Sequence, residues 1–372
     1  MIKKLLQGQA VEWQTLGEVA NLNRGRVMSK TYLADNIGEY PVYSSQTANN
    51  GEIGKINTFD FEGEFITWTT DGANAGTVFY RNEKFSITNV CGLITLKYDY
   101  LTYKFLFYWL SIQAKKHVYS GMGNPKLMSN QMEKIQIPIP PLSVQSHIVQ
   151  ILDTFTELNG QLTAEFGMRQ KQYQYYRDFL LSEHELAKVG FEWKTLGEVA
   201  NYEQPTKYLV KSKDYDDDFK TPVLTAGKTF ILGYTNETNG IYQASKNPVI
   251  IFDDFTTANK WVDFDFKAKS SAMKMISSVD ENQFLLKYIY YWLNTLPSGL
   301  VDGDHKRQWI SNFANKKIPI PPLSVQSQIV AILDTFDTLT QSISEGLPKE
   351  IKLRQKQYEY YRERLLNFKA TI

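Results

Sequence analysis

Side chains suited to reading the edges of nucleic-acid bases are concentrated in a few glycine-containing segments of both halves of the chain. Asn and Gln amides can pair bidentately with adenine, Lys and Arg with guanine, and Ser or Thr hydroxyls with either. Glycine lets the backbone approach a phosphate closely. The candidates are Gln46, Lys55, Thr70, Asn74, Asn124 and Lys126 in the first half, and Lys228, Thr229, Thr257, Asn259, Lys260, Lys269, Ser271, His305, Lys306 and Arg307 in the second.

These candidates lie in polar segments flanked by aromatic or β-branched runs, which predicts loops between strands. The same composition is also typical of solvated turns, so residue type alone does not establish binding. Position favours binding, because segments 120–126 and 298–309 precede the same Ile-Pro-Ile-Pro-Pro motif by a similar distance. The net charge is only +1, so attraction of nucleic acid must depend on local basic patches such as 305–307.

Catalytic patterns are weak throughout the chain. "TAGKT" at 225–229 lacks the leading glycine of a phosphate loop, and "DFDFKAK" at 263–269 resembles a nuclease motif less than an alternating strand. Asn-Pro-Pro-aromatic, the adenine-pocket motif of amino-methyltransferases, is absent. Four His and one Cys make a metal site improbable. We therefore expect a non-enzymatic chain with no cofactor or metal of its own.

Bulk properties indicate a folded protein of two or more domains. The chain has 372 residues, of which 42% are hydrophobic and 14% aromatic. It contains no apolar run of membrane-spanning length and no signal-peptide pattern near Met1. A single cysteine, Cys91, excludes an intramolecular disulfide and favours the reducing cytoplasm.

Three blocks occur twice, about 180 residues apart. "EWQTLGEVAN" at 12–21 returns at 192–201 as "EWKTLGEVAN", and "QIPIPPLSVQSHIVQILDTF" at 136–155 returns almost unchanged at 317–336. "RQKQYQYYR" at 169–177 returns at 354–362. This period is too long for a solenoid repeat, so it indicates a duplicated domain pair. Between the blocks, apolar positions match while polar ones differ, as expected for shared cores with divergent loops.

Each Ile-Pro-Ile-Pro-Pro motif predicts a stiff connector, because proline disfavours helix and central strand. Ser143 and Ser324 are candidate N-caps for the long amphipathic helices that follow, each roughly 38–40 residues and about 55–60 Å long. Apolar residues recur at heptad-like spacing, which favours an antiparallel helix pair. Gly346 and Pro348 should kink or interrupt the second helix. The two halves resemble a ring cut open, with neighbouring termini.

The expected fold class is α+β, with two globular α/β lobes, two long antiparallel coiled-coil-like helices and a pseudo-twofold internal duplication. The expected boundaries are 1–141 for the first lobe, 142–186 for the central helix, 187–322 for the second lobe and 323–372 for the C-terminal helix.

Two variable lobes, each followed by Ile-Pro-Ile-Pro-Pro-Leu-Ser-x-Gln and by a helix with Arg-Gln-Lys-Gln-Tyr-x-Tyr-Tyr-Arg, resemble the DNA specificity (S) subunit of type I restriction–modification enzymes. The resemblance covers essentially the whole chain. It implies that each lobe is a target recognition domain for one half of a bipartite, asymmetric site in double-stranded DNA. It also implies that the helices set the gap between the half-sites.

The resemblance further implies partners. Two methyltransferase subunits carrying S-adenosylmethionine would dock on the repeated surface and methylate adenine at N6, and two restriction–translocase subunits using ATP and Mg would complete the nuclease. The duplicated blocks then offer equivalent sites to identical partners. Candidate docking residues are Gln145, Arg169, Tyr173, Tyr176, Arg177, Gln326, Arg354, Tyr358, Tyr361 and Arg362, although many of them could instead pack the helices together.

Three alternatives stay open on sequence alone. A type IIB-like enzyme would use the same kind of recognition subunit with a fused methyltransferase–nuclease partner. A coiled-coil scaffold would show no DNA dependence. A nuclease built on 263–269 would cut DNA by itself and lose that activity in Asp265→Ala.

Overall fold

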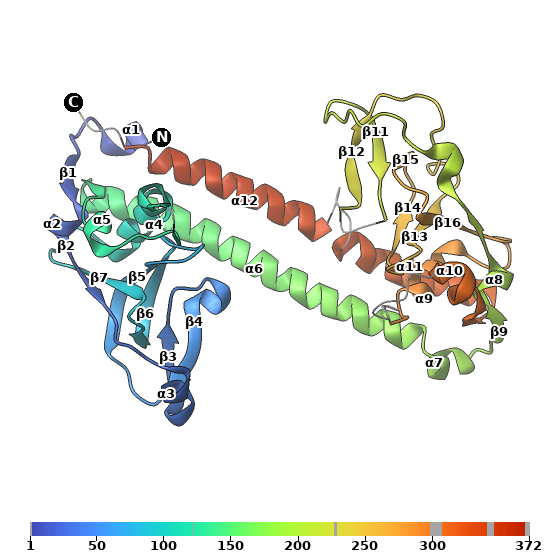
Figure 1. Ribbon diagram of the computed structural model, residues 1–372, viewed down its shortest axis with the longest axis horizontal. Coiled ribbons are helices and arrows are strands. Elements are labelled where there is room, and N and C mark those ends of the chain that lie inside the picture. The colour runs from blue at the N-terminus through green and yellow to red at the C-terminus, as the bar shows by residue number, and fades with distance from the viewer. Residues whose placement is uncertain (1, 122, 227–228, 298–306, 341–345, 369–372) are drawn as a thin grey trace. The chain divides into compact units, whose positions relative to one another are not determined.

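The computed structural model describes residues 2–121, 123–226, 229–297, 307–340 and 346–368 (Figure 1). The chain divides into two compact units. Unit 1 comprises Met1–Gln161 and Ile351–Ile372, and unit 2 comprises Leu162–Glu350. Each unit therefore combines one lobe with segments of long helix that come from both copies of the repeat. The mixture of helix and sheet confirms the expected fold class.

The lobe of unit 1 is built on a mixed sheet of order β2-β7-β5-β6-β3-β4. Its pairs are antiparallel except for β3 with β6. Helix α4 (Tyr103–Gln113) packs on β5 and β6 and buries Phe105 and Leu106 against Trp68. The strands are β2 (Ala20–Arg24), β3 (Ile37–Tyr43), β4 (Glu52–Ile56), β5 (Phe61–Thr69), β6 (Val78–Ile87) and β7 (Cys91–Leu96). Short helices are α3 (Lys30–Asp35) and α5 (Ser129–Met132).

The lobe of unit 2 repeats this plan with two smaller sheets, of order β10-β16-β13-β14 and β12-β11-β15. Helix α9 (Leu286–Leu293) takes the place of α4 and buries Tyr288, Ile289 and Tyr291. The strands are β10 (Ala200–Glu203), β11 (Thr221–Leu224), β12 (Ile231–Thr235), β13 (Val249–Asp253), β14 (Asn259–Val262), β15 (Lys267–Ala268) and β16 (Met273–Ser278), and helix α10 is Gln308–Ser311.

The first two repeated blocks pair with each other inside each unit. Strand β1 (Glu12–Thr15) runs antiparallel to β8 (Gln136–Ile139), and β9 (Glu192–Thr195) pairs likewise with β17 (Lys317–Ile320). The motif is more than a connector, because its first proline, Pro138 or Pro319, lies within one of these strands, while the exclusion of helix and central strand agrees with the two-stranded ladders. These prolines are tolerated because each ladder, as described, has only two strands, so the proline needs no donor toward a second neighbour.

Each ladder leads into one turn of helix, α2 (Leu16–Val19) or α8 (Leu196–Val199), with the same capping box. Glu18 Oε2 accepts hydrogen bonds from the Thr15 amide at 2.6 Å and from the Thr15 hydroxyl at 2.8 Å. Glu198 does the same with Thr195. These bonds favour the charged carboxylates and lower the pKa of both glutamates. The duplicated sequence thus produces the same local structure twice.

The long helices are α6 (Leu142–Leu180), α11 (Leu323–Thr340) and α12 (Gly346–Leu365). The N-caps predicted at Ser143 and Ser324 are wrong by two positions, because α6 and α11 begin at Leu142 and Leu323 and the capping positions are Pro141 and Pro322. The carbonyl of Pro141 accepts the first amides of α6. The interruption predicted at Gly346 is confirmed. Its φ of +73° lies outside the helical range, and a Cβ there would stand 2.4 Å from the Thr338 carbonyl oxygen.

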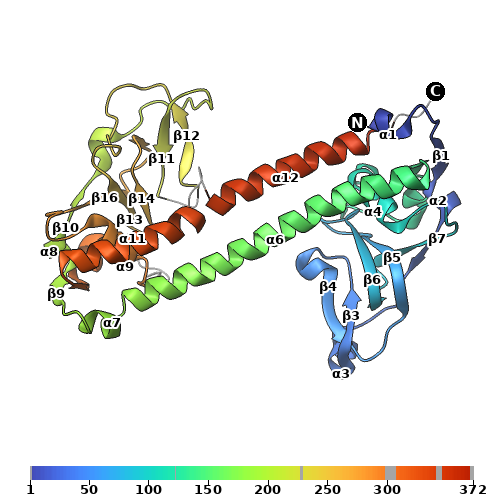
Figure 2. The same cartoon turned by 180° about the vertical axis from the view of Figure 1, so that it is seen from behind.

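The two ends of the chain meet within unit 1. Leu365 and Phe368, at and just after the end of α12, pack into the core of the first lobe, with Phe368 edge-on to Phe105 and Trp109. Ile2 of α1 (Ile2–Leu6) joins the same cluster, and α1 lies beside the end of α12 in both views (Figure 2). In unit 2 the continuous segment from α6 into α7 (Glu183–Ala187) fills the matching place. This agrees with the expectation that the N-terminal and C-terminal segments are neighbours.

Candidate nucleic-acid interface

Three polar loops of the first lobe, far apart in the sequence, meet at one end of its sheet. The Ser45 hydroxyl accepts a hydrogen bond from the Thr70 amide at 3.1 Å, which joins loop 44–51 to loop 69–77. The Gly72 amide donates to the Pro125 carbonyl at 3.0 Å, and the Leu127 amide donates to the Thr70 carbonyl at 2.8 Å. The segments singled out in the sequence of this lobe therefore form one surface.

Not every candidate in these loops faces outward. Asn74, Asn124 and Lys126 are exposed on the joined loops, and Lys55 is exposed on β4. Gln46 is half-buried and donates to the Glu52 carbonyl at 2.6 Å. Thr70 is buried, and its hydroxyl donates to the Val90 carbonyl at 2.8 Å. Thr70 therefore holds the loops together beneath the surface instead of presenting its hydroxyl to a ligand.

A buried arginine supports loop 44–51 from below, and sequence reasoning missed it. Arg81 is 1% exposed, and its Nη2 donates to the Asn50 carbonyl at 2.7 Å. The guanidinium lies 3.4 Å from the centroid of the Tyr43 ring. Asn49 and Asn50 both have positive φ, a conformation that this contact helps to hold. Burial lowers the pKa of Arg81.

The second lobe assembles its loops around Asp254. The Asp254 carbonyl accepts the Gln308 amide at 2.8 Å, as the Thr70 carbonyl accepts the Leu127 amide in the first lobe. The Asp254 carboxylate accepts the Trp309 amide at 2.8 Å and pairs with Lys274 at 3.3 Å, with both side chains fully buried. Sequence reasoning missed Asp254. The feature that could have pointed to it is its position directly after β13, whose residues are all buried.

The candidates of the second lobe divide in the same way. Thr229, Lys260, Ser271 and Arg307 are exposed, and Asn259 and Lys269 are half-buried. Lys269 donates to the Tyr215 hydroxyl at 2.9 Å. Thr257 is buried, with a φ of +62°, and so shapes its loop from within. Lys228, His305 and Lys306 lie outside the described residues.

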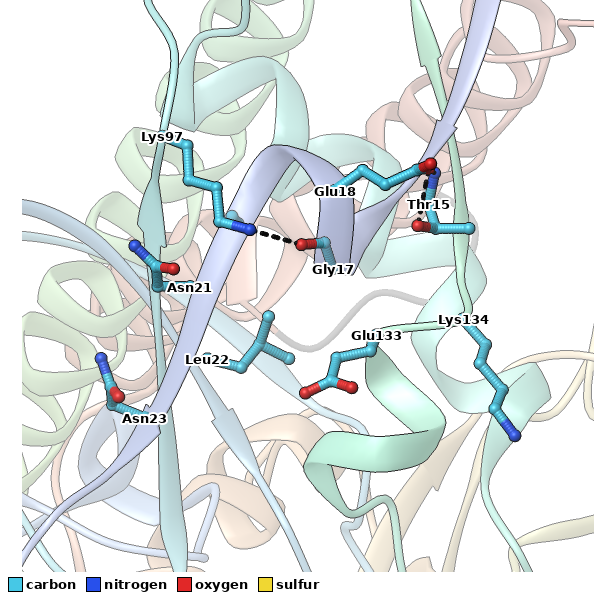
Figure 3. A pocket seen from close by; sticks show the side chains of 10 residues that line it. Thr15, Gly17, Glu18, Asn21, Leu22, Asn23, Lys97, Glu133 and Lys134 are labelled. Atoms are coloured by element: carbon cyan, nitrogen blue, oxygen red, sulfur yellow. Dashed lines mark hydrogen bonds between the residues drawn. The ribbon is translucent and has the colours of Figure 1, made fainter.

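A polar cleft of about 700 Å³ lies elsewhere in the first lobe, beside the capping box (Figure 3). Figure 3 shows Glu18 turned back onto Thr15 and Lys97 reaching the Gly17 carbonyl, a bond of 2.6 Å. Glu133 and Lys134 complete the charged lining, so acids balance bases. None of the candidate base-reading residues lines this cleft, and its balanced charge does not favour a phosphate.

The segment resembling a nuclease motif has a structural role. Asp265 accepts the Ser245 amide at 3.0 Å and the Ser245 hydroxyl at 2.6 Å, which lowers the pKa of the aspartate. Lys267 is buried and pairs with Glu237 at 3.0 Å. The acid and the lysine thus serve separate contacts. Across the described part of the chain, no cluster of three or more His, Cys, Asp or Glu side chains is suited to a metal ion.

Many candidate docking residues of the repeated helices are committed to contacts within their own unit. Gln145 and Gln326 are fully buried. Tyr173 is also buried, while Tyr176 and Tyr361 are half-buried and stack on phenylalanines. Three further side chains form intrahelical contacts: Arg169 bonds Glu165, and Arg177 and Arg362 lie over the rings of Tyr173 and Tyr358. Arg354 is half-buried and donates to Gln357 at 3.0 Å.

The exposed apolar side chains of the same helices occupy positions that sequence reasoning passed over. Tyr175 and Tyr360, equivalent in the repeat, are 63% and 52% exposed. One heptad earlier, Met168 and Leu353 are likewise equivalent and exposed. The signal was available in the sequence, because residues seven apart lie on one helix face and both pairs recur in the two copies. Helices α6 and α12 therefore present the same small apolar stripe.

Duplicated lobes, duplicated ladders and divergent loop clusters define an internally duplicated protein of the α+β class. The chain matches the family model of the type I restriction modification DNA specificity domain twice, over residues 10–166 and 188–353. It therefore belongs to the DNA specificity subunits of type I restriction–modification systems. Among the helices that the structure describes, none combines the length and apolar character needed to cross a membrane.

Similar proteins carry the same description. The Escherichia coli EcoR124I/EcoR124II type I specificity subunit is 68% identical over 188 residues, a match that spans 49% of this chain and 46% of that relative. A Mycoplasma pneumoniae chain named as a type I specificity subunit, S.MpnORF507P, is 33% identical over 94% of this chain and 96% of its own length. The crystal structure of a type I S subunit from M. genitalium has the same fold, with a TM-score of 0.69 over 98% of both chains at 16% identity.

Proposed function

We propose that this chain is the non-catalytic, DNA-reading subunit of a cytoplasmic type I restriction–modification complex. Each lobe reads one half of a bipartite, asymmetric site in double-stranded DNA, and the long helices set the gap between the halves. The observation that supports this most directly is the pair of loop clusters. Both are joined by equivalent backbone bonds, at Thr70 and at Asp254, yet they display different side chains. The same backbone arrangement thus carries different exposed polar side chains in the two lobes, which suits two half-sites of different sequence.

The duplicated frame also supports docking of two methyltransferase subunits, since equivalent surfaces suit identical partners. The exposed positions Tyr175 and Tyr360 fit this role better than the buried amides of Gln145 and Gln326. The methyltransferase subunits bring S-adenosylmethionine and modify adenine at N6. Two restriction–translocase subunits, using ATP and Mg, join the same assembly. The chain itself holds no cofactor in this proposal.

The test is methylation mapping in a host that lacks adenine methylation. We would co-express the chain with the methyltransferase subunit of its own system and locate N6-methyladenine by long-read sequencing. The expected result is a two-part motif with a few defined bases on each side of a fixed gap. A complex that forms but modifies no adenine would favour the scaffold alternative. Modification accompanied by cutting on both sides of the motif would favour a type IIB-like partner.

Lobe assignment is tested by substitutions at the exposed loop amides. Asn74→Ala together with Asn124→Ala should relax or alter one half-site and leave the other unchanged. Loss of one good bidentate base contact costs about 1–3 kcal/mol of discrimination. Asn21→Ala is the matched control, because it removes an exposed amide from the same lobe outside the loop cluster. Changes in both half-sites would contradict the division of labour between lobes.

A further inference from the structure

Each lobe is fastened to its own long helix by the same three polar residue types. In unit 1, Lys104 and Tyr108 project from one face of α4 toward Asp153 on α6. Lys104 Nζ lies 2.5 Å from Asp153 Oδ2, and the Tyr108 hydroxyl donates to Asp153 Oδ1 at 2.7 Å. One carboxylate therefore accepts from two side chains one helical turn apart.

Unit 2 contains the same arrangement. Lys287 and Tyr291 of α9 both reach Asp334 of α11; Lys287 Nζ lies 3.4 Å from Asp334 Oδ1, and the Tyr291 hydroxyl donates to the same oxygen. Tyr291 is fully buried. Burial and the neighbouring carboxylate raise the pKa of this phenol, so it stays a donor across the physiological range.

The lysine of each arrangement also contacts the sheet. Lys104 Nζ lies 5.5 Å from the centroid of the Tyr80 ring on β6, and Lys287 Nζ lies 4.2 Å from the Trp261 ring on β14. These distances are within cation–π range. Sheet, lobe helix and long helix are thus tied at one point. We call this point the lobe joint: Tyr80, Lys104, Tyr108 and Asp153 in unit 1, and Trp261, Lys287, Tyr291 and Asp334 in unit 2.

Stability alone does not account for the lysine–aspartate part of the joint. Lys104 and Asp153 are 39% and 37% exposed, and ion pairs so accessible to water contribute little to folding. The apolar contacts around α4 already bury its other face. The charged pair instead fixes an orientation. Together with the tyrosine it places two hydrogen bonds on one carboxylate, and these restrict rotation of the lobe helix about the long helix.

We propose that the two lobe joints are positioning elements for gap length, and that Lys104, Asp153, Lys287 and Asp334 fix the angle at which each lobe presents its loops to DNA. This inference rests on the proposed function. A domain of about 140 residues has a radius of gyration of about 14 Å. A tilt of about 13° then moves its surface by about 3 Å, close to the rise of about 3.4 Å per base pair. A loosened joint therefore tolerates a gap that is wrong by one base pair.

The test compares methyl transfer by the purified complex on duplexes with the native gap and with gaps one base pair shorter or longer. Asp153→Asn, Lys104→Met and Asp334→Asn weaken the joint while keeping side-chain volume close to the original. Glu157→Gln is the control, since it removes one charge from an exposed site one turn along α6. A misplacement of about 1 Å can cost about 100-fold in rate, so we expect the ratio of native-gap to altered-gap rates to fall at least about tenfold in the joint variants.

This ratio separates the possible outcomes. A variant that merely loses stability lowers both rates and leaves the ratio unchanged, and that result overturns the inference. An equal fall in the native-gap to altered-gap ratio in Glu157→Gln also overturns the inference, because the effect would then come from the loss of a negative charge alone. Failure of the unaltered complex to distinguish a bipartite site would instead refute the proposed function. Where Asp153→Asn unfolds the lobe, the milder Tyr108→Phe tests the same bond.

Discussion

The ring of Phe155 stacks on the ring of Tyr361, with centroids 5.2 Å apart and an angle of 22° between the planes. Phe336 stacks on Tyr176 with nearly identical geometry, 5.3 Å and 20°. The first contact lies in unit 1 and the second in unit 2, and each joins a residue of one copy of the repeat to a residue of the other. The repeated helices therefore complete the units by exchanging their C-terminal ends.

Removing a stacked tyrosine should destabilise its own unit. We expect Tyr361→Ala or Tyr176→Ala to lower the free energy of unfolding by about 2 kcal/mol, below the usual cost for a fully buried aromatic because both rings are half-buried. The measurement is urea denaturation followed by circular dichroism. Tyr360→Ala and Tyr175→Ala are the matched controls, since these exposed neighbours should cost less than about 0.5 kcal/mol.

The exposed tyrosines should instead affect assembly. In the proposed complex, Tyr175→Ala and Tyr360→Ala together weaken binding of the methyltransferase partner while the unfolding curve stays in place. Size-exclusion chromatography of the co-expressed proteins measures this directly. If the double variant still assembles fully, the apolar stripe is not part of the docking surface.

The buried amide of Gln326 should contribute strongly to the stability of unit 2. Its Nε2 donates to the Gln283 and Pro321 carbonyls, both at 2.9 Å, and its Oε1 accepts the Leu285 amide at 2.9 Å. Gln145 makes the same three kinds of contact in unit 1. Gln326→Leu leaves three backbone groups without a partner, and we expect a loss of about 3 kcal/mol in the free energy of unfolding.

Gln328→Leu provides the control for that experiment, because this exposed glutamine lies two residues further along the same helix. Thermal unfolding of both variants measures the difference. Unchanged stability in Gln326→Leu, with loss of partner binding, would mean that the amide serves docking after all.

A carboxylate in unit 2 should make stability depend on pH. Asp337 occupies the position of Thr156 in the repeat, and one of its oxygens is buried without a hydrogen-bond partner. Burial raises the pKa of Asp337 in the folded state. A raised pKa means that the folded state binds the proton more tightly, so stability is lost as pH rises from the ordinary value near 4 through the raised value.

Asp337→Asn removes this penalty. The gain in unfolding free energy over the parent chain should grow with rising pH and reach about 1 kcal/mol at neutrality, a shift of roughly 2–4 °C in the unfolding temperature. Calorimetry between about pH 4 and 8 follows the difference. Asp217→Asn, at an exposed position, should show no such trend. A pH-independent gain would point to a packing effect instead.

Repetition and periodicity in the sequence predicted the duplicated lobes and the long helices. Residue type did not predict which polar side chains are buried. The repeated blocks predicted equivalent local structure, and the capping boxes at Thr15 and Thr195 show it. Gln145 was expected to dock a partner because it belongs to a duplicated block, yet here it satisfies backbone groups beside the proline-rich strand. The pairing of the two repeated helices was expected from their apolar stripes, but the individual stacks of Phe155 on Tyr361 and of Phe336 on Tyr176 were not, because a heptad stripe does not specify which residues meet.

The length of α6 should determine the gap between the half-sites in the proposed complex. Segment 162–166, "LTAEF", lies inside the continuous helix, and Thr163 and Ala164 are exposed. Inserting Thr-Ala-Glu-Leu after Leu162 adds about 6 Å and advances the helix by about 40° beyond one full turn, so the apolar face nearly keeps its direction. The second copy already has four more residues between Phe336 and Arg354 than the first has between Phe155 and Arg169.

An added 6 Å corresponds to between one and two base pairs at about 3.4 Å each. We therefore expect the insertion to lengthen the non-specific gap and leave both half-sites unchanged, as measured by adenine methylation mapping. A two-residue insertion, Thr-Ala, is the matched control. It turns the far end of the helix by about 200°. The stack of Tyr176 on Phe336 and the stack of Phe155 on Tyr361 then cannot both form. Methylation should therefore be lost. A change in the bases recognised in either half-site after the four-residue insertion would show that α6 influences base recognition as well as spacing.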